Sequence, residues 1–159
     1  MIESHTLFYI VVALLLVGGN AFFVAAEFAF VKVRATRLEE MEKSGLPGSA
    51  LAREIASRLD EYLSACQLGI TMVSLGLGWI GEPAFAALLK PLFAGLGALA
   101  APAAHAAAIT VAFAIITVLH IVLGELVPKS LAIRKPGRVA RISALPLNAW
   151  GERIRRELT

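Results

Sequence analysis

The sequence predicts an all-α membrane protein with three transmembrane helices, a cytoplasmic helical hairpin and a juxtamembrane helix that lies like a belt along the membrane surface. Three apolar runs predict the spans, at about residues 6–31, 62–80 and 107–127, since each approaches the ~20 residues that a helix needs to cross the hydrocarbon core. The composition agrees, because 58% of the residues are hydrophobic and the mean hydropathy is +0.75. Three spans therefore account for most of the chain.

The first predicted span is interpreted as a permanent membrane anchor. It is longer than the apolar core of a signal peptide, and no basic residue precedes it. It also continues into a charged segment without a convincing cleavage site. The run is therefore kept as part of the membrane domain.

Two polar residues in this span, Asn20 and Glu27, are seven positions apart, so they share one helical face about 10 Å apart along the axis. A carboxylate within a bilayer costs roughly 2.5–3.5 kcal/mol on insertion scales, which makes Glu27 a candidate for an ion path or a proton relay. Its alternative is a structural role, with the side chain reaching the nearby interface or a basic residue of the hairpin. Asn20 is too deep for that, so it must bond to another helix or serve as a ligand.

Residues 34–61 predict a hairpin of two short charged helices at the membrane surface. The segment 44–48, with the sequence Ser-Gly-Leu-Pro-Gly, separates them and is a strong turn signal. We therefore expect one helix on each side of this turn.

The second predicted span carries polar and small residues at steps of three and four, which places them on one helical face. These residues are Ser64, Gln67, Thr71, Ser74 and Gly78. A single residue of this kind is uninformative, because hydroxyl groups bond to their own helix and small residues mark helix packing. Five in register favour a functional lining.

The orientation follows from the basic residues. None precedes the first span, six lie in residues 32–61, one lies between the second and third spans, and eight follow residue 128. The positive-inside rule then places the N-terminus outside and the C-terminus in the cytoplasm. Segment 82–104 is therefore expected to be a short helix or a re-entrant segment on the outer side, with prolines at its bends.

The third predicted span ends in an informative backbone feature. Pro128 has no N–H, so the carbonyl of Gly124 loses its helical partner, and glycine has no side chain to shield it. A cation, a water or a side chain from another span can take up this carbonyl. Thr110, Thr117 and Gly124 are spaced by seven residues and share a helical face, which His120 partly joins. A single histidine at such a position is more often a packing residue than a ligand.

After Pro128, residues 129–158 are expected to form the juxtamembrane helix. Apolar residues alternate there with basic ones, a pattern suited to anionic lipid headgroups. A solvated basic face is the alternative interpretation.

The polar groups of the three spans are carboxylate, amide, hydroxyl and carbonyl oxygens. Such ligands suit Mg²⁺, Ca²⁺ or Na⁺ rather than zinc or copper. The sequence has no P-loop, no redox motif and no nucleophile with a matching base, so we do not expect an enzyme.

Three segments, 20–29, 63–71 and 124–130, together resemble the transmembrane domain of the CorC/cyclin M family, which is linked to Mg²⁺ efflux. The resemblance implies a homodimer of three-span domains in the bacterial inner membrane. It also implies Mg²⁺ export coupled to Na⁺ entry, and cytoplasmic CBS-type domains that are absent from this chain.

By matched position, the resemblance implies two sets of site residues. The metal site would comprise Asn20, Thr71, Ser74, the carbonyl of Gly124, and Glu125. Gating or a second ion site would involve Glu27, Ser64, Gln67, Pro128 and Lys129.

The sequence departs from the family pattern where many members carry serine or asparagine, notably at Val24, Ala26 and Ile70. Fewer side-chain oxygens favour a weaker site, water retained on the ion, or another cargo. The leading hypothesis is Mg²⁺ export. The alternatives are export of another cation, such as a polyamine, and a non-transporting dimeric anchor for a cytoplasmic regulatory module.

Overall fold

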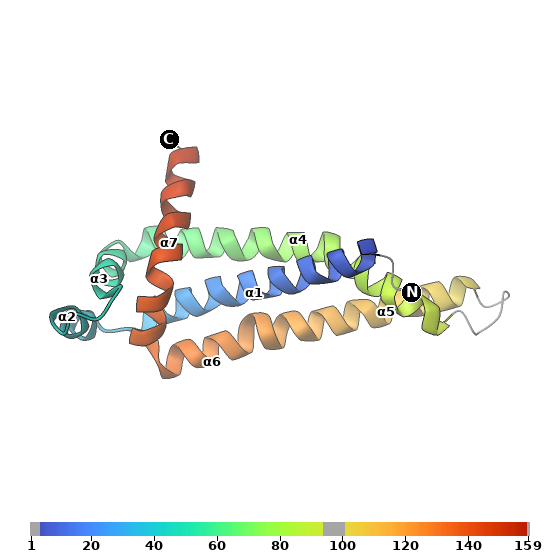
Figure 1. The fold of residues 1–159 in the computed structure, drawn as a ribbon, viewed down its shortest axis with the longest axis horizontal. Helices are drawn as coiled ribbons and strands as arrows, with labels where there is room; N and C mark the ends of the chain where they lie inside the picture. The colour runs from blue at the N-terminus through green and yellow to red at the C-terminus, as the bar shows by residue number, and fades with distance from the viewer. Residues whose placement is uncertain (1–3, 94–100, 159) are drawn as a thin grey trace.

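The computed structural model describes residues 4–93 and 101–158, in which every regular element is a helix (Figure 1). In chain order the elements are α1 (Ser4–Lys32), α2 (Ala35–Lys43), α3 (Ser49–Ser57), α4 (Leu59–Phe93), α5 (Ala101–Leu119), the π-helix η3 (His120–Leu126), α6 (Val127–Arg134) and α7 (Pro136–Leu158). None of the described residues forms a β-strand. The predicted all-α fold is confirmed.

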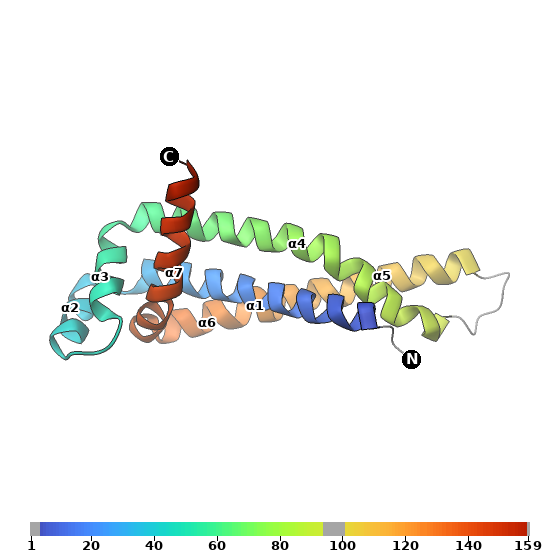
Figure 2. The same cartoon turned by 45° about the horizontal axis from the view of Figure 1, so that its top comes forward.

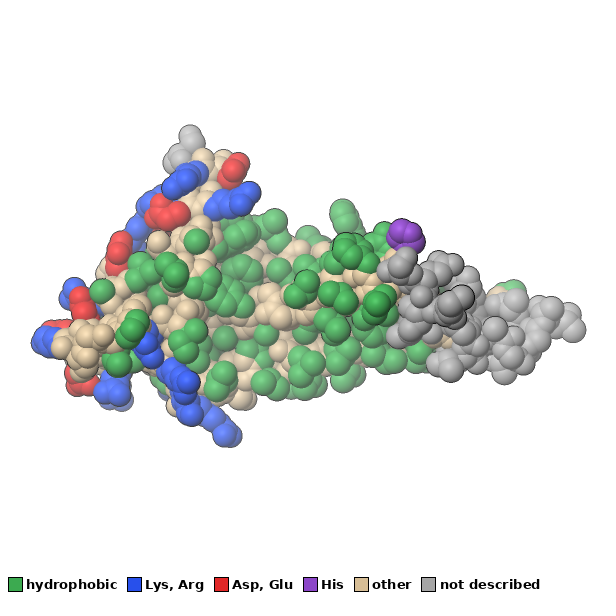
Figure 3. Space-filling model, viewed as in Figure 1, with side chains coloured by type: hydrophobic (Ala, Val, Ile, Leu, Met, Phe, Trp, Pro, Cys, Tyr) green, Lys and Arg blue, Asp and Glu red, His purple; other side chains and the backbone are tan. Residues whose placement is uncertain are grey.

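Three long rods lie side by side along the molecule (Figures 1 and 2). They are α1, α4 and the continuous run α5–η3–α6, and α1 packs against both of the others. The segments long and apolar enough to cross a membrane are His5–Lys32, Leu59–Ala87 and Ile109–Arg134. Figure 3 shows hydrophobic side chains along the rods and charged ones at the end that holds α2, α3 and α7.

The second rod differs from the expectation of a separate short helix or re-entrant segment over 82–104. Helix α4 continues through Pro83 as far as Phe93, and its last part turns away from the rest (Figure 2). It continues because Ala84 is buried and Phe85 packs against a buried apolar cluster that includes Ile116. Membrane helices also tolerate the loss of the backbone hydrogen bond that a proline removes. Residues 94–100 lie outside the described residues.

The predicted hairpin consists of α2 and α3, and it turns on two glycines. Gly45 has φ +69° and Gly48 has φ +80°, backbone conformations that residues with a Cβ rarely adopt. The Nη1 of Arg141 donates a hydrogen bond of 2.9 Å to the carbonyl of Pro47. The turn is thereby attached to α7.

The expected single helix over 129–158 is divided into α6 and α7. The break is at Lys135, which has φ −133° and ψ 56°. The cause is Pro136, because the ring of a proline disfavours helical geometry in the residue before it. Helix α6 prolongs the third rod, whereas α7 crosses the ends of the rods (Figures 1 and 2).

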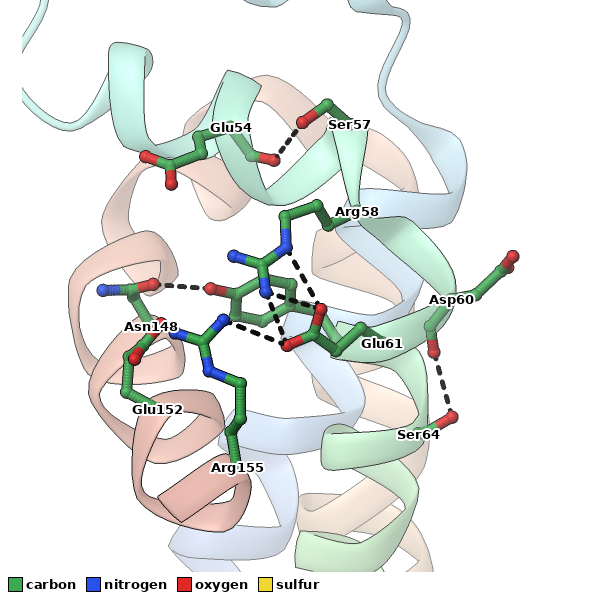
Figure 4. A network of polar contacts seen from close by, with 10 residues as sticks. Glu54, Ser57, Arg58, Asp60, Glu61, Ser64, Asn148, Glu152 and Arg155 are labelled. Carbon is green, nitrogen blue, oxygen red and sulfur yellow. Dashed lines mark hydrogen bonds and ion pairs between the residues drawn. The ribbon is translucent and has the colours of Figure 1, made fainter. Parts of the chain in front are cut away.

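Helix α7 is held against α4 by polar contacts near the start of that rod. The Tyr62 hydroxyl donates a hydrogen bond of 2.5 Å to Oδ1 of Asn148, and Nε1 of Trp150 donates one of 2.9 Å to the carbonyl of Ala65. Glu61 lies between two guanidinium groups, those of Arg58 and Arg155 (Figure 4). These contacts fix α7 to the second rod.

Candidate functional site

The central polar contact of the rods joins α1 to the π-helix η3. Asn20 is completely buried, and its Nδ2 donates a hydrogen bond of 3.1 Å to the carbonyl oxygen of Gly124. A Cβ at position 124 would lie 3.2 Å from this nitrogen, which is tighter than ordinary van der Waals contact. Glycine therefore lets the carboxamide approach the backbone closely.

The carbonyl is available because of the local sequence. In an α-helix it would accept a bond from residue 128, which is a proline and has no N–H. Here the chain is a π-helix instead, and the N–H of Val127 bonds to the carbonyl of Val122, five residues back. The sequence left a cation, a water or a side chain from another span as possible partners of this carbonyl. In the structure the partner is the side chain of Asn20.

Asn20 presents a second polar atom that has no partner. Its Oδ1 is buried, and no hydrogen bond to it is found among the described residues. Leaving a buried polar group unpaired costs about 1–3 kcal/mol, so an unpaired atom needs an explanation. The carboxamide thus offers an acceptor oxygen inside the bundle, beside the buried carbonyl of Gly124.

Next to this contact, the π-helix brings an imidazole to a carboxylate. Nε2 of His120 lies 3.3 Å from Oε1 of Glu125, and the two side chains are 17% and 49% exposed. Five residues along an α-helix would separate the two by about 140° around the axis, so the wider π turn is what brings them together. Nδ1 of His120 is buried and, within the described chain, has no hydrogen-bond partner.

Sequence reasoning did not assign His120 to the site. The sequence does place His120 five residues before Glu125, ahead of Pro128. That spacing brings the two side chains together only in a π-helix, which the sequence did not predict.

The predicted lining on α4 is not brought to Asn20. The Thr71 hydroxyl donates to the carbonyl of Gln67 in its own helix, and the Ser64 hydroxyl does the same to Asp60 (Figure 4 shows the latter), each at 2.9 Å. Both threonine and serine are exposed, Ser74 is half-buried and Gly78 is exposed. A different face of α4, which includes Gly69, packs on α1.

The remaining predicted residues lie nearer the hairpin end of the rods. Glu27 is half-buried and forms no ion pair with the described residues. Nζ of Lys129 instead lies 4.4 Å from the centroid of the Phe28 ring, a cation–π contact. Pro128 is buried against the bundle.

Comparison with known families gives a match to the cyclin M transmembrane N-terminal domain over residues 11–151. The chain belongs to this family. As a cyclin M transmembrane domain it is a multi-pass membrane protein, in keeping with its three candidate spans.

Relatives of this cyclin M domain occur in several bacteria. UPF0053 protein YugS of Bacillus subtilis is 50% identical over 132 residues, which cover 83% of this chain and 30% of YugS. UPF0053 protein YrkA of the same organism is 43% identical over 145 residues, covering 91% of this chain and 33% of YrkA. Uncharacterized protein Rv1841c of Mycobacterium tuberculosis is 39% identical over 137 residues, or 86% and 38% of the two chains. The chain thus spans about a third of the length of these relatives.

Proposed function

We propose that this chain is the membrane domain of a Mg²⁺ exporter in which Na⁺ entry drives Mg²⁺ out. The observation that carries the proposal is the fully buried Asn20. Its Nδ2 bonds to the carbonyl of Gly124, the residue before Glu125, and its Oδ1 has no hydrogen-bond partner among the described residues. Buried oxygen atoms beside a carboxylate are the ligands that a hard divalent cation prefers.

The ligand set fits an ion that keeps part of its water. A carbonyl oxygen has two lone pairs, so Gly124 can accept the Asn20 hydrogen bond and still face an ion. Asn20, Gly124 and Glu125 together supply one amide, one carbonyl and one carboxylate group. Mg²⁺ takes six oxygens and commonly retains several waters, so three protein groups are a reasonable share.

Thr71 and Ser74 join the site in this proposal through a homodimer. The polar face of α4 is exposed, and Gln67 on it makes no side-chain hydrogen bond within the described chain. Such a face is unfavourable against lipid, and a second copy of the chain would cover it. Glu27 and Lys129 are proposed to act at the cytoplasmic mouth, below the ion.

We further propose the bacterial inner membrane as the location, with the hairpin end in the cytoplasm. Basic residues gather at that end, as the positive-inside rule requires (Figure 3). Helix α7 would lie in the headgroup region, since Ile142 and Leu145 on it are 61% and 72% exposed and Arg138 beside them is exposed too. Cytoplasmic regulatory domains would occupy the part of the relatives that this chain does not span.

Calorimetry of Mg²⁺ binding to the purified chain, with and without Na⁺, tests the proposal. Saturable binding should be lost in Glu125→Ala and weakened in Asn20→Ala. Thr110→Ala is the matched control, because in the described part of the chain this exposed hydroxyl bonds only to the carbonyl of Ala106 in its own helix. Unchanged binding in both site variants would sink the proposal.

A second candidate is a non-transporting dimeric anchor, which the separation of the α4 face from Asn20 favours. In that case Thr71→Ala with Ser74→Ala should weaken the dimer in detergent, and no cation should bind. If instead the dimer is weakened but Mg²⁺ still binds, the anchor is contradicted. The ion site then consists of Asn20 and Glu125 without Thr71 and Ser74.

A further inference from the structure

We propose that a cleft between the end of α1, the first turn of α2 and the start of α7 holds the headgroup of an anionic phospholipid from the membrane leaflet at the hairpin end. The cleft has a volume of about 430 Å³, and Lys32, Arg34, Arg37 and Pro136 are part of its lining. Its basic residues precede the juxtamembrane segment 129–158, which the sequence pattern assigned to headgroups. The inference concerns a different surface from the ion site on Asn20 and does not depend on it.

The cleft has fixed walls because α2 packs against the start of α7. A Cβ at Gly137 would lie 3.0 Å from Sδ of Met41 and 3.7 Å from Cγ of Arg37, so the absence of a side chain there lets the two helices approach closely. Leu38, next to Arg37, is completely buried and anchors α2 from its other side. The basic residues are therefore presented by packed helices.

Two of the three cations in the cleft are not neutralised by a carboxylate. Nη1 of Arg37 lies 2.9 Å from Oε2 of Glu40, which also lines the cleft. Lys32 and Arg34 are exposed, and neither forms an ion pair with a described residue. The segment 126–151, which includes Pro136, adds five basic residues and no acidic one. Cations gathered in this way repel one another and attract a phosphate group.

The position of the cleft favours a lipid over a soluble anion. The first candidate span ends at Lys32, and the third ends at Arg134, two residues before Pro136. The cleft therefore opens where two spans leave the hydrocarbon core, which is the depth of the lipid headgroups. Val31, which is 59% exposed, gives an acyl chain an apolar surface directly beside it. Basic pockets between membrane helices at this boundary bind anionic headgroups.

Thermal unfolding of the intact chain in detergent tests the proposal, with phosphatidylglycerol or phosphatidylcholine added. Phosphatidylglycerol should raise the melting temperature by roughly 3 °C or more beyond the effect of phosphatidylcholine, since a ligand stabilises the folded state by mass action. Lys32→Gln with Arg34→Gln should remove most of this difference. Arg153→Gln with Arg156→Gln is the matched control, because it removes the same charge from exposed residues near the end of α7. Each variant is compared with its own lipid-free sample, so a change in basal stability does not obscure the result.

Two further arms use the unmodified chain. Glycerol 3-phosphate, a soluble fragment of the lipid, should leave the melting temperature unchanged at the concentration at which phosphatidylglycerol acts. Raising the salt concentration from about 0.05 M to about 0.5 M should reduce the advantage of phosphatidylglycerol, because salt screens exposed charges. Equal shifts with the two lipids, a difference that salt does not change, or equal losses in the two double variants would overturn the proposal and leave a solvated basic surface. A full shift with glycerol 3-phosphate would overturn the assignment to a lipid.

Discussion

The ring of Phe23 on α1 occupies the space that Gly69 on α4 leaves open, so that a Cβ at Gly69 would lie 2.6 Å from the ring. The same ring packs on Trp150 of α7, with the two ring centroids 5.4 Å apart. Phe23 is thus where three helices meet, less than one turn beyond Asn20 on α1.

Gly69→Ala should destabilise the protein, because the added methyl group meets the Phe23 ring. Overpacking of this kind costs about 1–3 kcal/mol. Thermal unfolding in detergent, followed by circular dichroism, measures the loss. Gly78→Ala on the same helix is the control, since no heavy atom lies within 4 Å of a Cβ there. Equal stability of the two variants would contradict the close contact.

Trp150→Phe should loosen α7 from α4, because phenylalanine keeps an aromatic ring but cannot donate to the carbonyl of Ala65. The free energy of unfolding should fall by about 0.5–1.5 kcal/mol, and trypsin should cleave at the arginines of α7 faster. Trp79→Phe is the matched change, because Trp79 is 84% exposed. A comparable effect of Trp79→Phe would show that α7 is not specifically held by the indole.

Gly48→Ala and Gly45→Ala should differ in their cost. Both place alanine in the left-handed region, at a cost of about 1–2 kcal/mol each. A Cβ at Gly48 would in addition lie 2.6 Å from the carbonyl oxygen of Arg141, whereas one at Gly45 would meet nothing within 4 Å. Chemical denaturation should therefore find Gly48→Ala the less stable variant, and the reverse order would mean that the hairpin does not rest on α7.

Asn20→Ala should lower stability by about 1–3 kcal/mol, because the buried carbonyl of Gly124 is left without a donor. Asn20→Asp loses the same donor but adds a negative charge. Mg²⁺ should then raise the melting temperature of Asn20→Asp more than that of Asn20→Ala, since ligand binding stabilises the folded state by mass action. The same shift in both would argue against an ion next to residue 20.

Several features of the fold were predictable because they are local properties of the sequence. The length of each apolar run predicts the spans, and Gly45 and Gly48 predict a turn because glycine adopts positive φ without strain. The free carbonyl of Gly124 follows from Pro128 alone. The depth of Asn20 predicted a partner on another helix or a ligand, but the sequence did not pair it with Gly124, which is 104 residues away.

Other features depend on packing that the sequence pattern does not contain. The rotation of α4 follows from the fit of Phe23 into Gly69, and this fit leaves the face with Thr71 exposed. The continuation of α4 through Pro83 follows from the burial of Ala84. The residue types of His120–Leu126 do not distinguish a π-helix from an α-helix. The pairing of His120 with Glu125 was therefore not predictable.

The π-helix also sets the rotation of α6 and α7 relative to α5 about the axis of the third rod. Each residue of a π-helix advances less around the axis than a residue of an α-helix does, so a change of His120–Leu126 to α geometry would turn α6, and α7 behind it, about the rod. The same change would carry Glu125 away from His120. Any change of the π turn would therefore alter both the spacing between Glu125 and His120 and the angle at which α7 crosses the rods.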